Sequence, residues 1–223
     1  MLWTLIRNPS AANLLNTLYY LVAVVIALSC HEWAHAFAAH KMGDDTARYA
    51  GRMTVNPLAH LDILGFLCMM FVGFGWAKPV PVNPNNVKKG KLGQVFVSAA
   101  GVLTNFVLAF LSVFVVVYAG FFMEAGWLGD LLFNFFYYFM IINISLMVFN
   151  LIPLPPLDGY RVVKELTVGR VRNVNFFWTI ERYGAFVLFV LVMLDVLNPV
   201  LNWGVNGIFG FLSDIAFAVF GLR

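Results

Sequence analysis

The chain has 223 residues, of which 61% are apolar, 17% aromatic and only 11% charged. A soluble domain carries about 25% charged residues, and the mean hydropathy of this chain is +0.83. These values exclude a soluble cytosolic enzyme, a disordered chain and a disulfide-stapled secreted module, and they leave an integral membrane protein. The net charge of +3, without a basic cluster among stacking aromatics, excludes a nucleic-acid-binding protein.

Apolar runs long enough to cross a bilayer occur five times along the chain. They cover residues 14–39, 95–122, 131–153, 184–197 and 205–220. A sixth run, 63–77, is short for a span and contains three glycines, so we expect a re-entrant segment there, with a segment packed against the bundle as the alternative. The expected fold class is an all-α polytopic membrane protein with about five transmembrane helices.

The placement of basic residues predicts the topology. Lysines and arginines gather in the loops 41–62, 78–91 and 161–182, whereas the turns 124–130 and 198–204 hold none. If 63–77 does not cross, every basic loop lies on one side, as the positive-inside rule requires. We therefore expect a multi-pass protein of the cell membrane with its C-terminus in the cytoplasm. Lys78 and the lysines of 88–91 are expected to meet anionic lipid headgroups.

The strongest chemical signal is the run His31-Glu32-Trp33-Ala34-His35. Residues i and i+4 of a helix share one face, so the imidazoles of His31 and His35 can bind one metal ion. Glu32 lies beside that ion, where it is placed to accept a proton from water. An unbroken apolar run precedes the motif, and polar side chains at that depth are unfavourable unless they pair or bind a ligand.

A catalytic zinc site needs a third protein ligand and one open position. Asp158 is the best candidate, because two crossings after His35 return the chain to the same face. Asp195 is expected near the outer face, and Asp214, in the middle of the last run, is less easily excluded. The prolines before Asp158 break the helix and free the backbone to aim its carboxylate. The alternative for Asp158 is a plain Asp-Gly turn at a helix exit.

The His31-Glu32-x-x-His35 motif and the later run Asn150-x-x-Pro153-x-x-x-Leu157-Asp158-Gly159 together resemble the site-2 protease family of intramembrane zinc metalloproteases. The chain is most similar to the small prokaryotic branch that lacks a PDZ domain. Segments 51–62 and 75–84, and the motif Ala100-Gly101-x-x-x-Asn105, also resemble that branch. Val102 and Ile63 stand where the family usually has proline, which affects local backbone shape and no ligand.

The resemblance implies one zinc ion per chain, bound by His31, His35 and Asp158, with Glu32 as the catalytic base. It also implies a transmembrane protein as substrate, cut close to the cytoplasmic face. Asn105 becomes a candidate second donor to the oxyanion, and a helix-packing amide is the equal alternative. We expect one membrane-embedded protease domain over 1–223, with a catalytic core at about 14–160 and a C-terminal helical hairpin at about 176–222. That hairpin could gate the lateral approach of the substrate.

Residues 48–56 alternate in a way that predicts a small β-hairpin near the cytoplasmic face. Its exposed edge could bind an unwound substrate as an added strand, and a plain loop is the alternative. For His60, on the same loop, two alternatives remain: it lines the cleft, or it lies at the surface.

Three other classes of function remain open: a catalytically inactive membrane metal-binding scaffold, a metal transporter, and a different membrane zinc hydrolase that acts on a lipid or a modified peptide. The run that ends in Leu157-Asp158-Gly159 argues against the last of these. Glu32 argues against a site that only binds metal, since binding alone needs no base. No internal repeat typical of transporters is visible. The identity of the substrate and the oligomeric state are not readable from the sequence.

Overall fold

The computed structural model describes residues 8, 10–72, 75–167 and 174–222. Helices long and apolar enough to cross a membrane are α2 (Ala11–Lys41), α6 (Gly90–Phe121), α7 (Trp127–Asn150), α9 (Val174–Met193) and α10 (Asn198–Phe220). The shorter helices are α3 (Thr46–Tyr49), α4 (Pro57–His60), α5 (Ile63–Val72), the 3-10 helix η1 (Pro84–Asn86) and α8 (Asp158–Thr167). The expected all-helical chain with five helices of spanning length is confirmed for the described residues.

Local chemistry sets the ends of these helices. The Ser10 hydroxyl accepts a hydrogen bond from the Asn13 amide (3.2 Å), which caps the start of α2. α7 ends at Asn150, three residues before the predicted end, because Pro153 cannot continue a helix. α10 begins at Asn198, earlier than predicted, because Pro199 stands in the first helical turn, where a missing N–H is tolerated.

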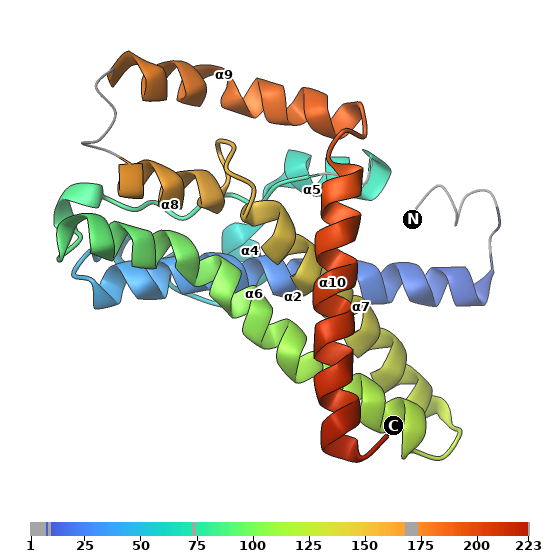
Figure 1. The fold of residues 1–223 in the computed structure, drawn as a ribbon. Coiled ribbons are helices and arrows are strands. Elements are labelled where there is room, and N and C mark those ends of the chain that lie inside the picture. Colours follow the sequence, from blue (N-terminus) through green and yellow to red (C-terminus); the bar gives the residue numbers. More distant parts are fainter. Residues whose placement is uncertain (1–7, 9, 73–74, 168–173, 223) are drawn as a thin grey trace.

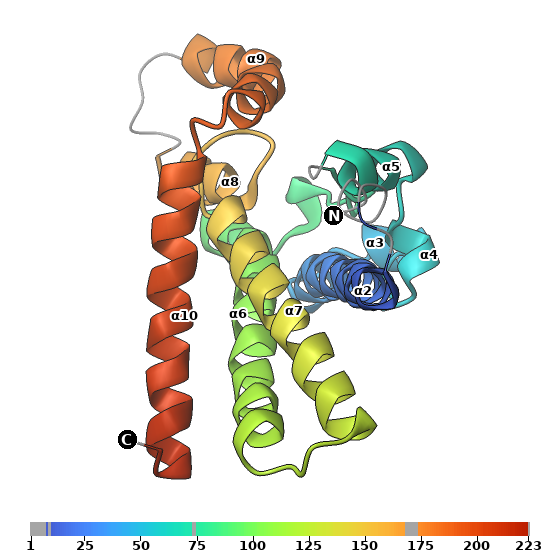
Figure 2. The same cartoon turned by 90° about the vertical axis from the view of Figure 1, so that its right-hand side faces the viewer.

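Helices α6 and α7 form the central pair of the structure (Figure 1). α10 runs alongside both of them, and α2 crosses them at a steep angle (Figure 2). α6, α7 and α10 share one cluster of buried apolar side chains. It consists of Ala109, Val113 and Val117 of α6, Met140, Ile144 and Val148 of α7, and Leu212 and Ala216 of α10.

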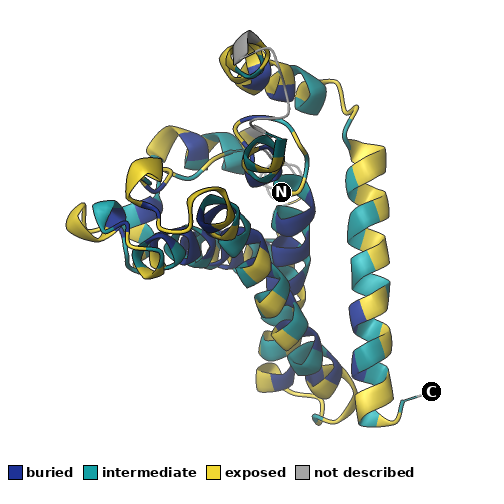
Figure 3. Ribbon diagram, turned by 60° about the vertical axis from the view of Figure 1, so that its left-hand side comes forward, coloured by how far each residue is buried: buried dark blue, intermediate teal, exposed yellow. Residues whose placement is uncertain are grey.

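Small residues let α2 approach the central pair closely. Ala23 and Ala27 are fully buried and pack in a cluster with Phe139 and Ile142 of α7. Figure 3 shows that buried positions gather along these inner helices, whereas α10 alternates between exposed and intermediate positions and has only Leu212 and Ala216 buried. The crossing brings the C-terminal half of α2, which carries His31 and His35, against α6.

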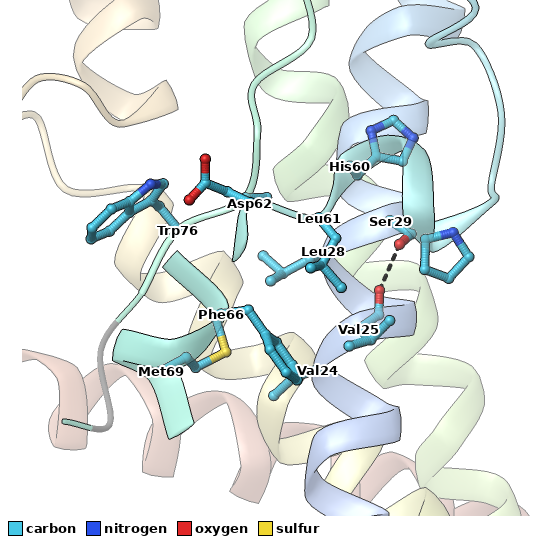
Figure 4. Close-up of a pocket in the computed structure, with 12 residues that line it drawn as sticks. Val24, Val25, Leu28, Ser29, His60, Leu61, Asp62, Phe66, Met69 and Trp76 are labelled. Atoms are coloured by element: carbon cyan, nitrogen blue, oxygen red, sulfur yellow. Dashed lines mark hydrogen bonds between the residues drawn. The ribbon is translucent and has the colours of Figure 1, made fainter. Parts of the chain in front are cut away.

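α5 lies on the outer side of α2. Figure 4 shows Phe66 and Met69 of α5 beside Val24 and Leu28 of α2, around a pocket of about 20 Å³. Such a pocket has room for about one water molecule. It lies between the two helices and is too small for a larger ligand.

The chain leaves α5 beside the place where it enters. A Cβ at Gly75 would lie 2.1 Å from the carbonyl oxygen of Gly65, so only glycine permits this backbone contact. The Lys78 amide then donates to the His60 carbonyl (2.8 Å). The segment 63–77 thus starts and finishes at one point, although residues 73–74 lie outside the described part.

The β-hairpin expected at 48–56 is not found. All nine of these residues are described, and they form the end of α3 followed by turns. The amides of Ala50, Gly51 and Arg52 donate to carbonyls three to five residues earlier, so none is free to form a ladder. A second reason is that Asp44 accepts hydrogen bonds from the amide and hydroxyl of Thr46, which starts a helical turn.

Candidate metal centre and active site

Three buried side chains from two distant parts of the chain meet at one point. His31 Nε2 and His35 Nε2, both on α2, are 3.1 Å apart. Each of these atoms is also 3.1 Å from Oδ2 of Asp158, the first residue of α8. The three atoms therefore form a nearly equilateral triangle, the one group among the described residues in which His, Cys, Asp or Glu side chains could hold a metal ion.

Both imidazoles are turned so that Nε2 faces the centre. His31 Nδ1 donates to Oδ1 of Asn105 (2.5 Å), and His35 Nδ1 donates to the carbonyl oxygen of Val97 (2.8 Å). Because both partners are carbonyl oxygens, each Nδ1 carries the proton and each Nε2 keeps its lone pair. Zinc-bound histidines have this arrangement, in which the outer hydrogen bond fixes the ring and its tautomer.

Glycines admit the ligands to their positions. A Cβ at Gly101 of α6 would lie 2.5 Å from Cε1 of His31 and 2.5 Å from Nε2 of His35. A Cβ at Gly159 would lie 2.3 Å from the carbonyl oxygen of Leu151. Gly101 thus leaves the space that the two imidazoles occupy, and Gly159 lets the chain fold back so that Asp158 reaches them.

The donor set fits zinc. Tetrahedral ligands at about 2.0–2.1 Å from a zinc ion lie about 3.3 Å from one another, close to the 3.1 Å edges observed here. Two neutral imidazoles and one carboxylate are a ligand set of catalytic zinc sites, which leave a fourth position open.

Glu32 is half-buried, next to the ligands in the chain. Its Oε2 accepts a hydrogen bond from the amide of Val80 (2.9 Å). Glu32 and the three potential ligands line a cavity of about 1450 Å³, which α9 and α10 also border. Ordinary small-molecule pockets measure about 300–1,000 Å³, so this cavity has room for a larger substrate.

Asn105 lies in direct contact with the centre, fully buried on α6. Its Oδ1 accepts from His31, and its Nδ2 donates to Oδ1 of Asn143 on α7 (2.7 Å). Asn143 in turn donates to the carbonyl oxygen of Phe139 (2.8 Å). This chain of hydrogen bonds ends at Nδ1 of His31, and the role of Asn105 as a donor to the oxyanion stays a prediction.

Sequence reasoning missed Asn143 and the packing role of Gly101. A signal for Asn143 was present, because an amide in the middle of an apolar run needs a partner inside the membrane. His60 is 2% exposed and donates from Nε2 to the carbonyl oxygen of Thr54 (2.7 Å), so it lies neither at the surface nor in the metal centre. Asp195 and Asp214 also lie outside the three-residue group.

Comparisons with known proteins point to a family of peptidases. The family model "Peptidase family M50" matches residues 123–194, the part that includes Asp158. The chain is 41% identical over 204 residues to a Bacillus subtilis (strain 168) protein named "Putative zinc metalloprotease YwhC", covering 88% of this chain and 92% of that protein.

A more distant relative comes from Mycolicibacterium smegmatis (strain ATCC 700084 / mc(2)155) and is named "Putative zinc metalloprotease Rip2". It is 25% identical over 185 residues, covering 78% of this chain and 66% of that protein. The search of solved structures finds no match. The extent of the first relationship shows that the chain belongs to peptidase family M50, the site-2 protease family, and is a zinc metalloprotease of the membrane.

Proposed function

We propose that the protein hydrolyses a peptide bond within the transmembrane segment of a membrane-protein substrate. His31, His35 and Asp158 bind the zinc ion, and Glu32 is the general base. The observation that carries the proposal is the position of the centre, buried where helices of spanning length meet and opening into the cavity beside Glu32. Such a position suits a substrate helix that approaches from within the membrane.

The residues divide the chemistry among them. A zinc ion, when bound, supplies Lewis-acid activation of water and of the scissile carbonyl. Glu32 takes a proton from the attacking water and returns it to the leaving amine. His31 and His35 keep their Nε2 lone pairs directed at the centre through the acceptors Asn105 and Val97. Asn105 acts in this account as a positioning residue for His31.

In the part of the chain that the structure describes, α9 is attached to the rest of the site at few points. Glu181 Oε1 accepts from Nζ of Lys164 (2.5 Å) and from the hydroxyl of Tyr160 (3.2 Å) on α8. Gly184 packs on Pro155, which a Cβ would meet at 2.6 Å. These contacts support the proposal that the C-terminal hairpin forms the movable side of the cavity through which a substrate helix enters.

We place the active site near the cytoplasmic face of the cell membrane, in one protease domain over 1–223. Asp158 and the histidines meet at the end of the bundle that carries the basic loops, in line with the positive-inside rule. The backbone contact of Gly65 with Gly75 supports a re-entrant segment at 63–77. Lys78 and the lysines at 88–91 are then in position to meet anionic headgroups.

The function is tested with purified protein in lipid vesicles and a panel of single-pass membrane proteins, each tagged on both sides of its transmembrane segment. We expect cleavage inside that segment, mapped by mass spectrometry, that a zinc chelator stops and added zinc restores. Glu32→Gln should retain zinc and lose cleavage, whereas Glu124→Gln, a matched change in the turn after α6, should behave like the parent. Cleavage by Glu32→Gln, or cuts only outside the membrane segment, would contradict the proposal.

A further inference from the structure

A short extended segment, 77–82, lies against the candidate general base. It contains the run Pro79-Val80-Pro81, in which only Val80 has a backbone N–H. That N–H donates to Oε2 of Glu32 (2.9 Å). A residue before proline is restricted to extended conformations, so the two prolines set the backbone that directs this one amide at the carboxylate.

A buried arginine holds the same segment from its other side. Arg52 is 9% exposed, and its guanidinium donates to the carbonyl oxygens of Lys78 (2.5 Å) and Pro79 (3.3 Å). Within the described residues it forms no ion pair with a carboxylate, and its Nε has no hydrogen-bond partner. A buried cation without a counterion is unfavourable, so the burial of Arg52 at this place needs a structural explanation.

The reason lies in one peptide group. The carbonyl that Pro79 offers to Arg52 and the N–H that Val80 offers to Glu32 belong to the same planar, trans peptide unit. Its dipole points from the arginine toward the glutamate, with the cation at the oxygen and the anion at the hydrogen. Each charge therefore strengthens the hydrogen bond of the other across a single rigid unit.

We propose that Arg52 is a positioning residue for Glu32, acting through the Pro79–Val80 peptide group. The inference rests on the proposed role of Glu32 as general base. The hydrogen bond occupies Oε2 and fixes the carboxylate, while Oε1 accepts no hydrogen bond from the described residues. One oxygen is thus held, and the other is available to exchange protons with water and the leaving amine.

The first experiment needs no substrate. Hydrogen–deuterium exchange of the full-length, zinc-loaded protein in detergent reads the Val80 amide, since neither flanking proline has one. We expect Glu32→Ala and Arg52→Gln each to accelerate its exchange by at least about 10-fold. Arg48→Gln, a matched change of an exposed arginine at the end of α3, should leave it unchanged. Unaltered Val80 exchange in either Glu32→Ala or Arg52→Gln would overturn the inference.

The second experiment separates positioning from general support of the fold. Val80→Pro removes the N–H and keeps a side chain of similar size, whereas Val80→Ala shortens the buried side chain and keeps the N–H. With a quenched-fluorescence peptide carrying one transmembrane segment, we expect Val80→Pro and Arg52→Gln to lower kcat by about 10- to 100-fold at unchanged KM and zinc content. Val80→Ala should exceed Val80→Pro in kcat by a similar factor, and Arg52→Lys should restore part of the loss.

Equal kcat for the two Val80 variants, or loss of zinc in Arg52→Gln and Arg52→Lys alike, would contradict positioning and assign Arg52 to the fold alone. If the parent protein cleaves no transmembrane peptide, the proposed function fails, and the exchange measurement still decides whether Arg52 orders the Val80–Glu32 hydrogen bond.

Discussion

Gly101 supports His31 so closely that a Cβ at this position would lie 2.5 Å from the imidazole carbon Cε1. Real side-chain contacts do not reach such a distance, so even a methyl group must displace the ring or the helix. The same Cβ would meet Nε2 of His35 at 2.5 Å. The geometry of the metal centre therefore requires that position 101 of α6 has no side chain.

We predict that Gly101→Ala lowers zinc affinity by at least about 10-fold, because it moves both histidine ligands out of place. Affinity is measured by competition with a chromogenic chelator on the purified protein. Gly207→Ala on α10 is the control, since a Cβ there has no heavy atom within 4 Å. Zinc affinity of Gly101→Ala equal to that of Gly207→Ala would show that the histidines do not pack as described.

The support of His31 by amides yields a second prediction. Asn105→Leu removes the acceptor of His31 Nδ1, and Asn143→Leu leaves the Asn105 amide without its acceptor. We expect each change to lower zinc affinity by about 10- to 100-fold. If Asn105 acted only as a hydrogen-bond donor to the oxyanion, Asn105→Leu would instead lower kcat and leave zinc affinity unchanged.

A matched control for these variants exists on the same helix as Asn143. Asn134 also donates from Nδ2 to the carbonyl oxygen four residues earlier (2.7 Å), at a site remote from the centre. Asn134→Leu should bind zinc like the parent. If Asn143→Leu also binds like the parent, the hydrogen-bond chain from Phe139 to His31 does not tune the metal.

Tyr160 provides a prediction about pH. Burial and the neighbouring charge of Glu181 raise the pKa of Tyr160 to about 12. The unfolded chain releases this phenolic proton near pH 10, whereas the folded protein holds it to about pH 12. Between these values the folded state binds more protons, so stability falls as pH rises from about 10 to 12.

This decline is measured by thermal unfolding of the detergent-solubilised protein between pH 9 and 12. Tyr160→Phe should make the loss of Tm with rising pH less steep, since the phenolic proton is gone from both states. The exposed Tyr49 is the control, and Tyr49→Phe should follow the parent. A Tyr160→Phe protein with the parent's slope would show that Tyr160 does not titrate in contact with Glu181.

The parts of the site that follow simple geometry were predictable from the sequence. His31 and His35 share a helix face because they are four residues apart, and that spacing alone predicts their meeting. Asp158 was predictable from topology, because counting crossings returns it to the same end of the bundle. The helices of spanning length were predictable from the long apolar runs, because such runs are stable in the interior of a lipid bilayer.

The parts that depend on tertiary contacts were not predictable in the same way. The alternation at 48–56 indicated a hairpin, but Asp44 starts a helical turn at Thr46 and uses the local amides. Arg52 entered the prediction only as one of the basic residues of the loop 41–62, and its burial against Lys78 and Pro79 follows only from the return of the chain after α5. Contacts between segments that are far apart in the sequence decide such features, and the sequence pattern does not show these contacts.

The central claim, a zinc centre built from His31, His35 and Asp158, is tested most directly by counting zinc ions per chain. Mass spectrometry of the metal in the purified parent, Asp158→Ala and the matched control Asp214→Asn needs no substrate. We predict about one zinc ion in the parent and in Asp214→Asn, and a large loss in Asp158→Ala, because two histidines alone hold zinc weakly. A parent without zinc, or an Asp158→Ala protein that keeps its full complement, would contradict this account.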